Sequence, residues 1–301
     1  MKQLLRTATT LTLALIVTVG MAFGQNDATV EQEGGSNSAS ISQEYTPGNS
    51  GIMNTVDAFQ DGDGNQIVNF SQFGDGNTAT IDQIGNNNDV GSNPKQGNKD
   101  ASFSRSQGGD IDIDQYGNQN DVWDIDQGNT GNEANIYQGG PEAGETTVSG
   151  NFVDVDLQLD TPTGGNNLQG NTVTITQKSD NNYVGTGNSS VRGVYQEGEG
   201  NALTITQEGD AGSKVGTALS GMYNGRNAIV QDGFDNTATV SQRAGGNHTV
   251  EYLIQDGSYN EAMIDQYGGS GNTASLVQLN NSNMADIDQN GSNNTAHVTQ
   301  Q

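Results

Sequence analysis

The chain has 301 residues, of which only 31% are hydrophobic, well below the ~45–50% that is usual in globular proteins. This leaves too little apolar material for one large globular core. The chain carries a formal net charge of -26, and it has no cysteine, which excludes a disulfide framework. The negative charge also argues against nucleic acid as a partner, because binding to a phosphate backbone depends on lysine and arginine.

The first predicted element is a secretory signal peptide over residues 1–24. Lys2 and Arg6 precede an apolar run from Leu11 to Val19, and the small residues Ala22 and Gly24 follow at the spacing that a signal peptidase needs. A membrane anchor is the alternative, but the apolar run is short for a spanning helix. We therefore expect cleavage after Gly24 and export of residues 25–301, in which eight basic residues face 36 acidic ones.

A short phrase then repeats along the whole remaining chain. It reads Asn-x-[Ala/Val/Leu]-x-[Ile/Val/Ala/Leu]-x-Gln and is often followed by x-Gly. Clean copies begin at Asn26, Asn37, Asn54, Asn77, Asn132, Asn171, Asn201, Asn236, Asn260, Asn272, Asn283 and Asn294. Looser copies end at Gln72, Gln107, Gln115, Gln127, Gln158, Gln196, Gln231 and Gln255.

Within each copy the pattern has a period of two, which predicts a β-strand and not a helix. The Gly- and Asn-rich links between copies predict turns. One such strand cannot bury its single small and single larger apolar residue, but stacked copies can. We therefore predict an all-β fold, a β-solenoid of strand-turn-strand coils over residues 25–301. Two strands per coil would give ten coils and a rod of roughly 48 Å, at ~4.8 Å per coil.

The Asn and Gln of each copy share a face with the apolar residues. A primary amide both donates and accepts hydrogen bonds, so identical amides stacked at strand spacing can form ladders along the axis. We expect such ladders to close the two margins of the apolar core. The predicted ladder and core residues are Asn77, Ala79, Ile81, Gln83, Asn260, Ala262, Ile264, Gln266, Asn283, Ala285, Ile287, Gln289, Asn294, Ala296, Val298 and Gln300.

The repeat is irregular in two respects. The copies ending at Gln72, Gln127 and Gln158 hold one extra residue, which predicts β-bulges. Longer Gly-, Ser- or Pro-bearing insertions lie near residues 86–100, 139–150, 159–170, 178–190 and 210–224, and we expect these to leave the rod as loops.

The sequence resembles the curlin repeat, the unit of curli fibre subunits. The segments "QFGDGNTATIDQ" (72–83), "QYGNQN" (115–120), "QEGEGNALTITQ" (196–207) and "QYGGSGNTASLVQ" (266–278) carry this resemblance. The resemblance implies a secreted subunit that polymerises into amyloid-like surface fibres for adhesion and biofilm matrix. It also implies a dedicated outer-membrane pore and a nucleator subunit as partners. The chain is about twice as long as a typical subunit, its insertions are longer, and Asn commonly takes the place of Ser. The resemblance therefore leaves three roles open: the major subunit, a nucleator or a specialised cap.

The ends of the solenoid suggest how such a fibre would grow. The copy at Asn26 follows the predicted cleavage directly, and the copy at Asn294 has no capping helix after it. Open sheet edges recruit further strands, so we expect head-to-tail growth into a homopolymer.

Outward-facing acids precede the terminal Gln of several copies, namely Asp82, Asp114, Asp126, Asp265 and Asp288. The simplest interpretation is solubility during export. The alternative is that acid or divalent cations speed assembly, since stacked like charges repel.

Other functions have weaker support. "DGDGN" at 61–65 matches calcium-binding repeats only in part, so we assign no metal, cofactor or catalytic site. The alternative function is a monomeric secreted β-solenoid that acts as an ice-binding or calcium-binding surface adhesin. Outward threonines at 172, 174, 176, 204, 206, 237 and 239 favour ice binding, although Phe59, Tyr137 and Met263 interrupt the array. His248 and His297 are expected at the surface, and the acids recur with the repeat, so the chain is not expected to be an enzyme.

Overall fold

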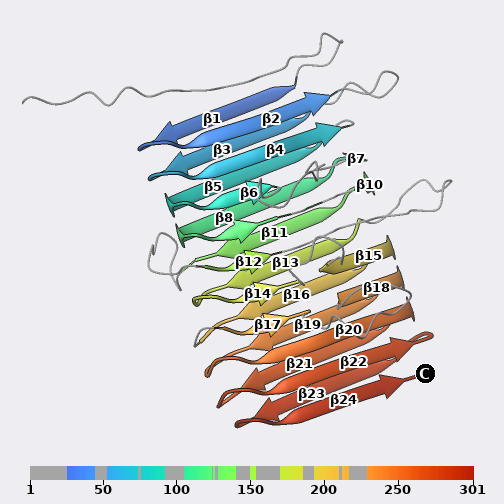
Figure 1. Cartoon of the computed structure of the whole chain (residues 1–301). Coiled ribbons are helices and arrows are strands. Elements are labelled where there is room, and N and C mark those ends of the chain that lie inside the picture. Colours follow the sequence, from blue (N-terminus) through green and yellow to red (C-terminus); the bar gives the residue numbers. More distant parts are fainter. Residues whose placement is uncertain are drawn as a thin grey trace, which may run out of the picture.

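The computed structural model of the chain describes residues 26–44, 53–73, 76–91, 105–123, 125, 128–139, 150–153, 170–185, 193–209, 212–216 and 229–301. The predicted signal peptide lies outside these residues, as do most of the predicted insertions near 86–100, 139–150, 159–170 and 210–224 and the end of the one near 178–190. The described residues form 24 β-strands, stacked as a rod that runs from β1 to β24 (Figure 1). The predicted all-β solenoid is therefore confirmed. No helix among the described residues has the length and apolarity needed to cross a bilayer.

One long sheet, here called sheet A, takes the first strand of every coil. All ten strands are parallel, and each pairs with its counterpart in the next coil without a register shift. Ten strands mean ten coils, as the repeat count predicts. In order, they are β1 (Asp27–Glu33), β3 (Thr55–Asp61), β5 (Thr78–Asn86), β8 (Asp110–Asn118), β11 (Glu133–Gln138), β13 (Thr172–Gln177), β16 (Ala202–Gln207), β19 (Thr237–Gln242), β21 (Glu261–Tyr267) and β23 (Met284–Asn290).

The second sheet, sheet B, faces sheet A and takes the return strand of each coil. Its strands are β2 (Ser38–Glu44), β4 (Gln66–Phe73), β6 (Asp89–Gly91), β9 (Asp121–Val122), β12 (Phe152–Val153), β14 (Tyr183–Val184), β15 (Val194–Glu199), β17 (Lys214–Val215), β18 (Ile229–Phe234), β20 (Thr249–Ser258), β22 (Thr273–Leu279) and β24 (Thr295–Gln300). β7 (Arg105–Gln107) and β10 (Gly128–Thr130) pair separately.

Several strands of sheet B stop at the same place, one row of register partners that runs across the sheet. The short strands β6, β9, β12, β14 and β17 all end within a residue of the row that contains Val90 and Val122. The longer strands β4 and β20 run through this row and shift register against β2 and β22 directly after it, so the predicted bulge in the copy ending at Gln72 is confirmed. Because a bulge already breaks the backbone ladder there, further residues can enter at that row without disturbing the ends of the strand.

Parts of the predicted insertion ranges belong to the rod. Residues 89–91, 183–184 and 214–215 lie inside the ranges 86–100, 178–190 and 210–224, yet they form β6, β14 and β17 of sheet B. Those three ranges were therefore too wide. The short strands escaped notice because each has only two or three residues of alternation before the repeat is broken.

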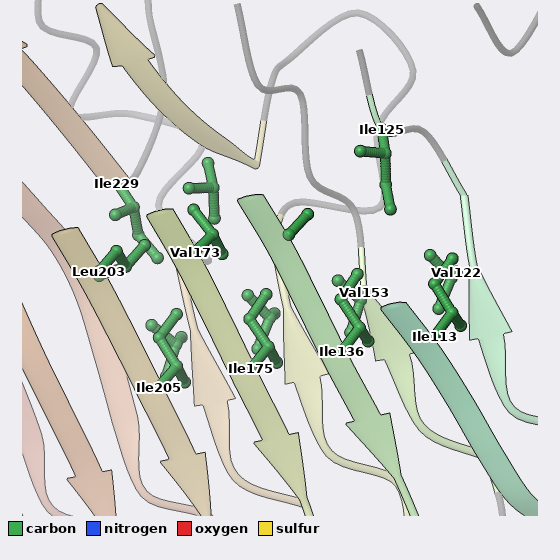
Figure 2. Close-up of a cluster of buried hydrophobic side chains, with 14 of the residues drawn as sticks. Ile113, Val122, Ile125, Ile136, Val153, Val173, Ile175, Leu203, Ile205 and Ile229 are labelled. Carbon is green, nitrogen blue, oxygen red and sulfur yellow. The ribbon is translucent and has the colours of Figure 1, made fainter. Parts of the chain in front are cut away.

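The core is a thin stack of apolar side chains between the sheets. Ile113, Ile136, Ile175 and Ile205 follow one another along sheet A, and Val122 and Val153 face them from sheet B (Figure 2). These six side chains are at most 2% exposed. Stacking thus supplies the burial that no single repeat could reach.

The x-Gly that follows the ladder Gln has a steric cause. Gly85 has a φ of +121°, and a Cβ there would lie 1.8 Å from the carbonyl oxygen of Gly117 in the next coil. Gly34 and Gly62 occupy the same place in earlier coils and meet the same obstacle. Glycine is required at this turn because the chain turns with positive φ and passes directly against the coil beneath it.

Candidate functional site

The first candidate site is a continuous ladder of glutamine side chains along sheet A. Each amide nitrogen Nε2 donates to the Oε1 of the glutamine in the next coil, for instance Gln83 to Gln115 at 2.8 Å and Gln242 to Gln266 at 2.9 Å. The ladder runs unbroken through Gln32, Gln60, Gln83, Gln115, Gln138, Gln177, Gln207, Gln242, Gln266 and Gln289.

The same glutamines also tie the two sheets together. Besides the ladder bond, the Nε2 of Gln83 donates to the carbonyl of Gln66 at 3.1 Å, and the Nε2 of Gln266 donates to the carbonyl of Thr249 at 3.2 Å. Both acceptors begin strands of sheet B. Each amide therefore uses both hydrogens and its oxygen, so a polar group sits inside the rod without an unpaired atom.

Sheet B has its own glutamine ladder. Gln43 donates to Gln72 at 2.9 Å, and a second run joins Gln196, Gln231, Gln255, Gln278 and Gln300 at 2.6 to 2.9 Å. Gln127 and Gln158, predicted to continue it, lie outside the described residues, as does the side chain of Gln107.

The asparagines form ladders of a different kind from the one that was expected. The Oδ1 of Asn54 accepts a hydrogen bond from the backbone N–H of Asn77 at 2.9 Å, and this contact recurs between coils in both sheets. Among the described asparagines that precede the strands of sheet A, side chains bond to each other, Nδ2 to Oδ1, only along the run Asn201, Asn236, Asn260 and Asn283. The expectation that like amides bond to each other is thus wrong for most asparagines. The asparagine side chain is one methylene shorter and reaches the backbone of the next coil instead.

The predicted ladder and core residues fall into three groups by burial. Asn77, Ala79, Ile81, Gln83, Ala262, Ile264 and Gln266 lie inside the stack and are at most 2% exposed, and Asn260 is 1% exposed. Ala285, Ile287 and Gln289 are 4 to 7% exposed in the last strand of sheet A. Asn283, Asn294, Ala296, Val298 and Gln300 are half-buried, because the structure places no coil beyond them.

His248 does not lie at the surface, contrary to expectation. Its side chain is fully buried, and neither ring nitrogen has a hydrogen-bond partner. It occupies the asparagine position of sheet B, between Ser213 and Asn272. The spacing could have shown this, since His248 follows Gln242 by six residues just as Asn272 follows Gln266. His297 is exposed as expected and contacts the hydroxyl of Tyr252 at 2.9 Å.

A pair of acids on sheet B was missed by the sequence analysis. Asp89 and Asp121 are register partners on β6 and β9, and each has a buried Oδ1 without a hydrogen-bond partner. Burial and, to a smaller extent, the neighbouring Asp121 carboxylate together raise the pKa of Asp89 to about 7. Burial raises the pKa of Asp121 to about 6, although the Trp123 indole donates to its Oδ2 at 3.0 Å and lowers it.

The predicted outward acids stack in register on sheet A. Asp82 faces Asp114, and Asp265 faces Asp288. Burial, together with the neighbouring carboxylates Asp112 and Asp82, raises the pKa of Asp114 to about 6. Asp265 pairs with Arg243, and the hydroxyl of Tyr267 donates to Asp288 at 3.3 Å. Asp126 lies outside the described residues.

Part of the threonine array is continuous. On β13, β16 and β19, Thr174 pairs with Thr204 and then Thr239, and Thr176 pairs with Thr206 and then Ser241. Met263 follows on β21 and ends the first row. No group of three or more His, Cys, Asp or Glu side chains that could hold a metal occurs among the described residues.

Two parallel sheets joined by glutamine ladders, with one short repeat per strand, define a β-solenoid whose coils are built from stacked amides. Comparison with known families agrees with this architecture. The curlin associated repeat matches residues 24–50, 68–91 and 253–279. These three matches show that the chain contains curlin repeats, and they support its resemblance to the curlin-repeat family. A comparison with curated proteins gave no match.

Proposed function

We propose that this protein is a secreted structural subunit that polymerises head-to-tail into curli-like amyloid fibres on the cell surface. The observation that carries the proposal is the open stack of parallel, in-register coils. β1 and β23 are the end strands of sheet A, and each has one paired neighbour. Exposed edges of this kind recruit further strands, and a contact between opposite ends does not close on itself.

The fibre would serve adhesion and the biofilm matrix. Export would depend on the predicted signal peptide and on a dedicated outer-membrane pore, and growth would start on a nucleator subunit. The acidic outward face supports this proposal, because stacked carboxylates such as Asp82 and Asp114 keep subunits soluble before assembly.

The direct test uses the chain without residues 1–24. We expect thioflavin-positive fibres with a ~4.7–4.8 Å meridional reflection, the spacing between strands along the axis. A protein that stays monomeric for days at high concentration contradicts the proposal.

A second candidate function is that of a monomeric surface-binding solenoid. The hydroxyl rows of β13, β16 and β19 favour ice binding, since they place threonine and serine side chains in register on three adjacent strands. Thermal hysteresis of the monomer would support this function, and its absence at high concentration would remove it.

A further inference from the structure

Two tyrosines lie against each other on the outer face of sheet A. Tyr116 belongs to β8 and Tyr137 to β11, and these strands pair as neighbours in adjacent coils (Figure 1). Their ring centroids are 5.7 Å apart, and the ring planes are inclined to each other by 41°. Aromatic pairs at this separation are in direct contact. The stacking of the coils thus brings together two phenols that are far apart in the repeat pattern.

A glycine shapes this contact. Gln138 is the register partner of Gln115, so the next residues, Gly139 and Tyr116, lie opposite each other in adjacent coils. The Tyr137 ring lies over Gly139: a Cβ built on this glycine would be 3.0 Å from the Tyr137 hydroxyl and 3.1 Å from the Cβ of Tyr116. Gly139 is buried, whereas both tyrosines are half-buried. The two rings therefore meet above a glycine, and part of each ring is open to solvent.

Carboxylates border the tyrosine pair. Asp114 is the register partner of Tyr137, and Asp82 is the partner of Asp114 in the preceding coil. Burial and, after it, the carboxylates of Asp114 and Asp82 raise the pKa of Tyr116, so this phenol is protonated at neutral pH. Asp114 has a pKa of about 6, which makes its carboxylate a stronger base than an ordinary aspartate. A base that can take the phenol proton therefore lies close to the pair.

We propose that Tyr116 and Tyr137 are a site of dityrosine formation, in which a one-electron oxidant such as a haem peroxidase with hydrogen peroxide crosslinks the two rings. Each phenol gives one electron to the oxidant and one proton to water or a nearby carboxylate. The two phenoxyl radicals join through a bond between their ortho carbons, and the hydrogens at those carbons move through water to the phenol oxygens. Overall, two tyrosines and one hydrogen peroxide give one dityrosine and two water molecules.

The crosslink strengthens a section of the rod in which sheet B contributes little. β11 pairs β8 over Glu133–Gln138, but β12 pairs β9 through Phe152 and Val153 alone in the described part of sheet B. A covalent bond between Tyr116 and Tyr137 closes a loop of about 20 residues, which lowers the entropy that the chain gains when these coils open. This inference goes beyond the proposed function, because it concerns one molecule and holds whether or not fibres form.

The test uses the chain without residues 1–24, kept monomeric by dilution. It is treated with a haem peroxidase and hydrogen peroxide, and in parallel with a small photo-oxidised ruthenium complex that reaches half-buried rings. Digestion follows with a protease that cleaves at acidic residues, because Asp121 and Glu133 lie between the two tyrosines. We expect the peptides bearing Tyr116 and Tyr137 to be joined, to be lighter by two hydrogens than their sum, and to show dityrosine fluorescence.

Matched variants separate this site from the other tyrosines. Tyr137→Phe keeps the ring but cannot form a phenoxyl radical, so the joined peptides should be lost. Tyr259→Phe removes a tyrosine that is 63% exposed, and the yield of joined peptides should stay unchanged. Gly139→Ala places a methyl group beneath the Tyr137 ring and should lower the yield, with the fold checked by circular dichroism.

Several outcomes would overturn the proposal, and none of them bears on fibre formation. These are the absence of the joined peptides with both oxidants, an equal yield from the chain unfolded in urea, and a product in which Tyr116 or Tyr137 joins only a second copy. The stabilising effect has its own measurement. Amides of β8 and β11 in the crosslinked monomer should exchange with solvent at least roughly tenfold more slowly than before oxidation, and unchanged exchange would overturn this effect.

Discussion

The glutamine ladder makes a specific prediction about stability. Gln83 is fully buried and takes part in three hydrogen bonds: its Nε2 donates to Gln115 and to the carbonyl of Gln66, and its Oε1 accepts from Gln60 at 2.7 Å. Replacement by leucine keeps the size of the side chain but removes all three bonds and orphans the buried Oε1 of Gln115. At a net ~0.5–1.5 kcal/mol per bond, the loss should be about 2–4 kcal/mol.

The control is the same substitution at the end of the ladder. Gln300 is half-buried, donates to the carbonyl of Met284 at 2.8 Å and accepts from Gln278. Water reaches this end of the rod and can replace the lost partners, so Gln300→Leu should cost less than ~1 kcal/mol.

Native-state hydrogen exchange on the monomer is the suitable assay, because long repeat arrays do not unfold as a single unit. We expect the opening free energy of amides in β3, β5 and β8 to fall by the stated amount in Gln83→Leu. Equal losses in the two variants, or a loss below ~0.5 kcal/mol in Gln83→Leu, would refute the idea that the ladder stabilises the rod.

Three further predictions concern single positions. The raised pKa values of Asp89 and Asp121 mean that folding favours their neutral forms, so the urea midpoint should rise as pH falls from 8 to 5, and less so in Asp89→Asn. Gly85→Ala should lower the urea midpoint far more than Gly108→Ala, because both have positive φ but only Gly85 lies against the next coil. His248→Asn should raise the opening free energy of amides in β20 by about 1–3 kcal/mol, measured by native-state hydrogen exchange, since an amide at this position can bond as its neighbours in the ladder do.

Clear outcomes would contradict each of these. A urea midpoint that falls on acidification to pH 5 would show that Asp89 and Asp121 are not held neutral by burial. Equal losses at Gly85 and Gly108 would mean that backbone conformation, and not the approach of the next coil, determines the cost. A less stable His248→Asn protein would show that the imidazole fills its site better than an amide can.

Much of the architecture followed from the repeat alone. The alternation in segments such as Asn77–Gln83 predicts strands, their number predicts ten coils, and the amides on the apolar face predict glutamine ladders. Each of these depends on residues that are adjacent in sequence. The extra residue before Gln72 likewise predicts a bulge that the register of β4 confirms.

Other features depended on which residues of neighbouring coils lie side by side. From the sequence we expected His248 at the surface, but the structure buries it. We also expected asparagine side chains to bond to each other, but most of their Oδ1 atoms accept from backbone N–H groups instead. Asp89 and Asp121 are 32 residues apart and carry no signal of pairing until β6 and β9 align.

What the sequence determined by itself was the period: which side chains point inward, how long a strand is and how often the chain turns. What only the tertiary structure decided was the partner of each side chain. Stacking brings together residues from consecutive coils, and the insertions make the distance in sequence between those residues irregular. Only the aligned coils show at which row of sheet B the insertions enter. Only they show that Ala28 and Val30 in β1, and Ala296 and Val298 in β24, are half-buried.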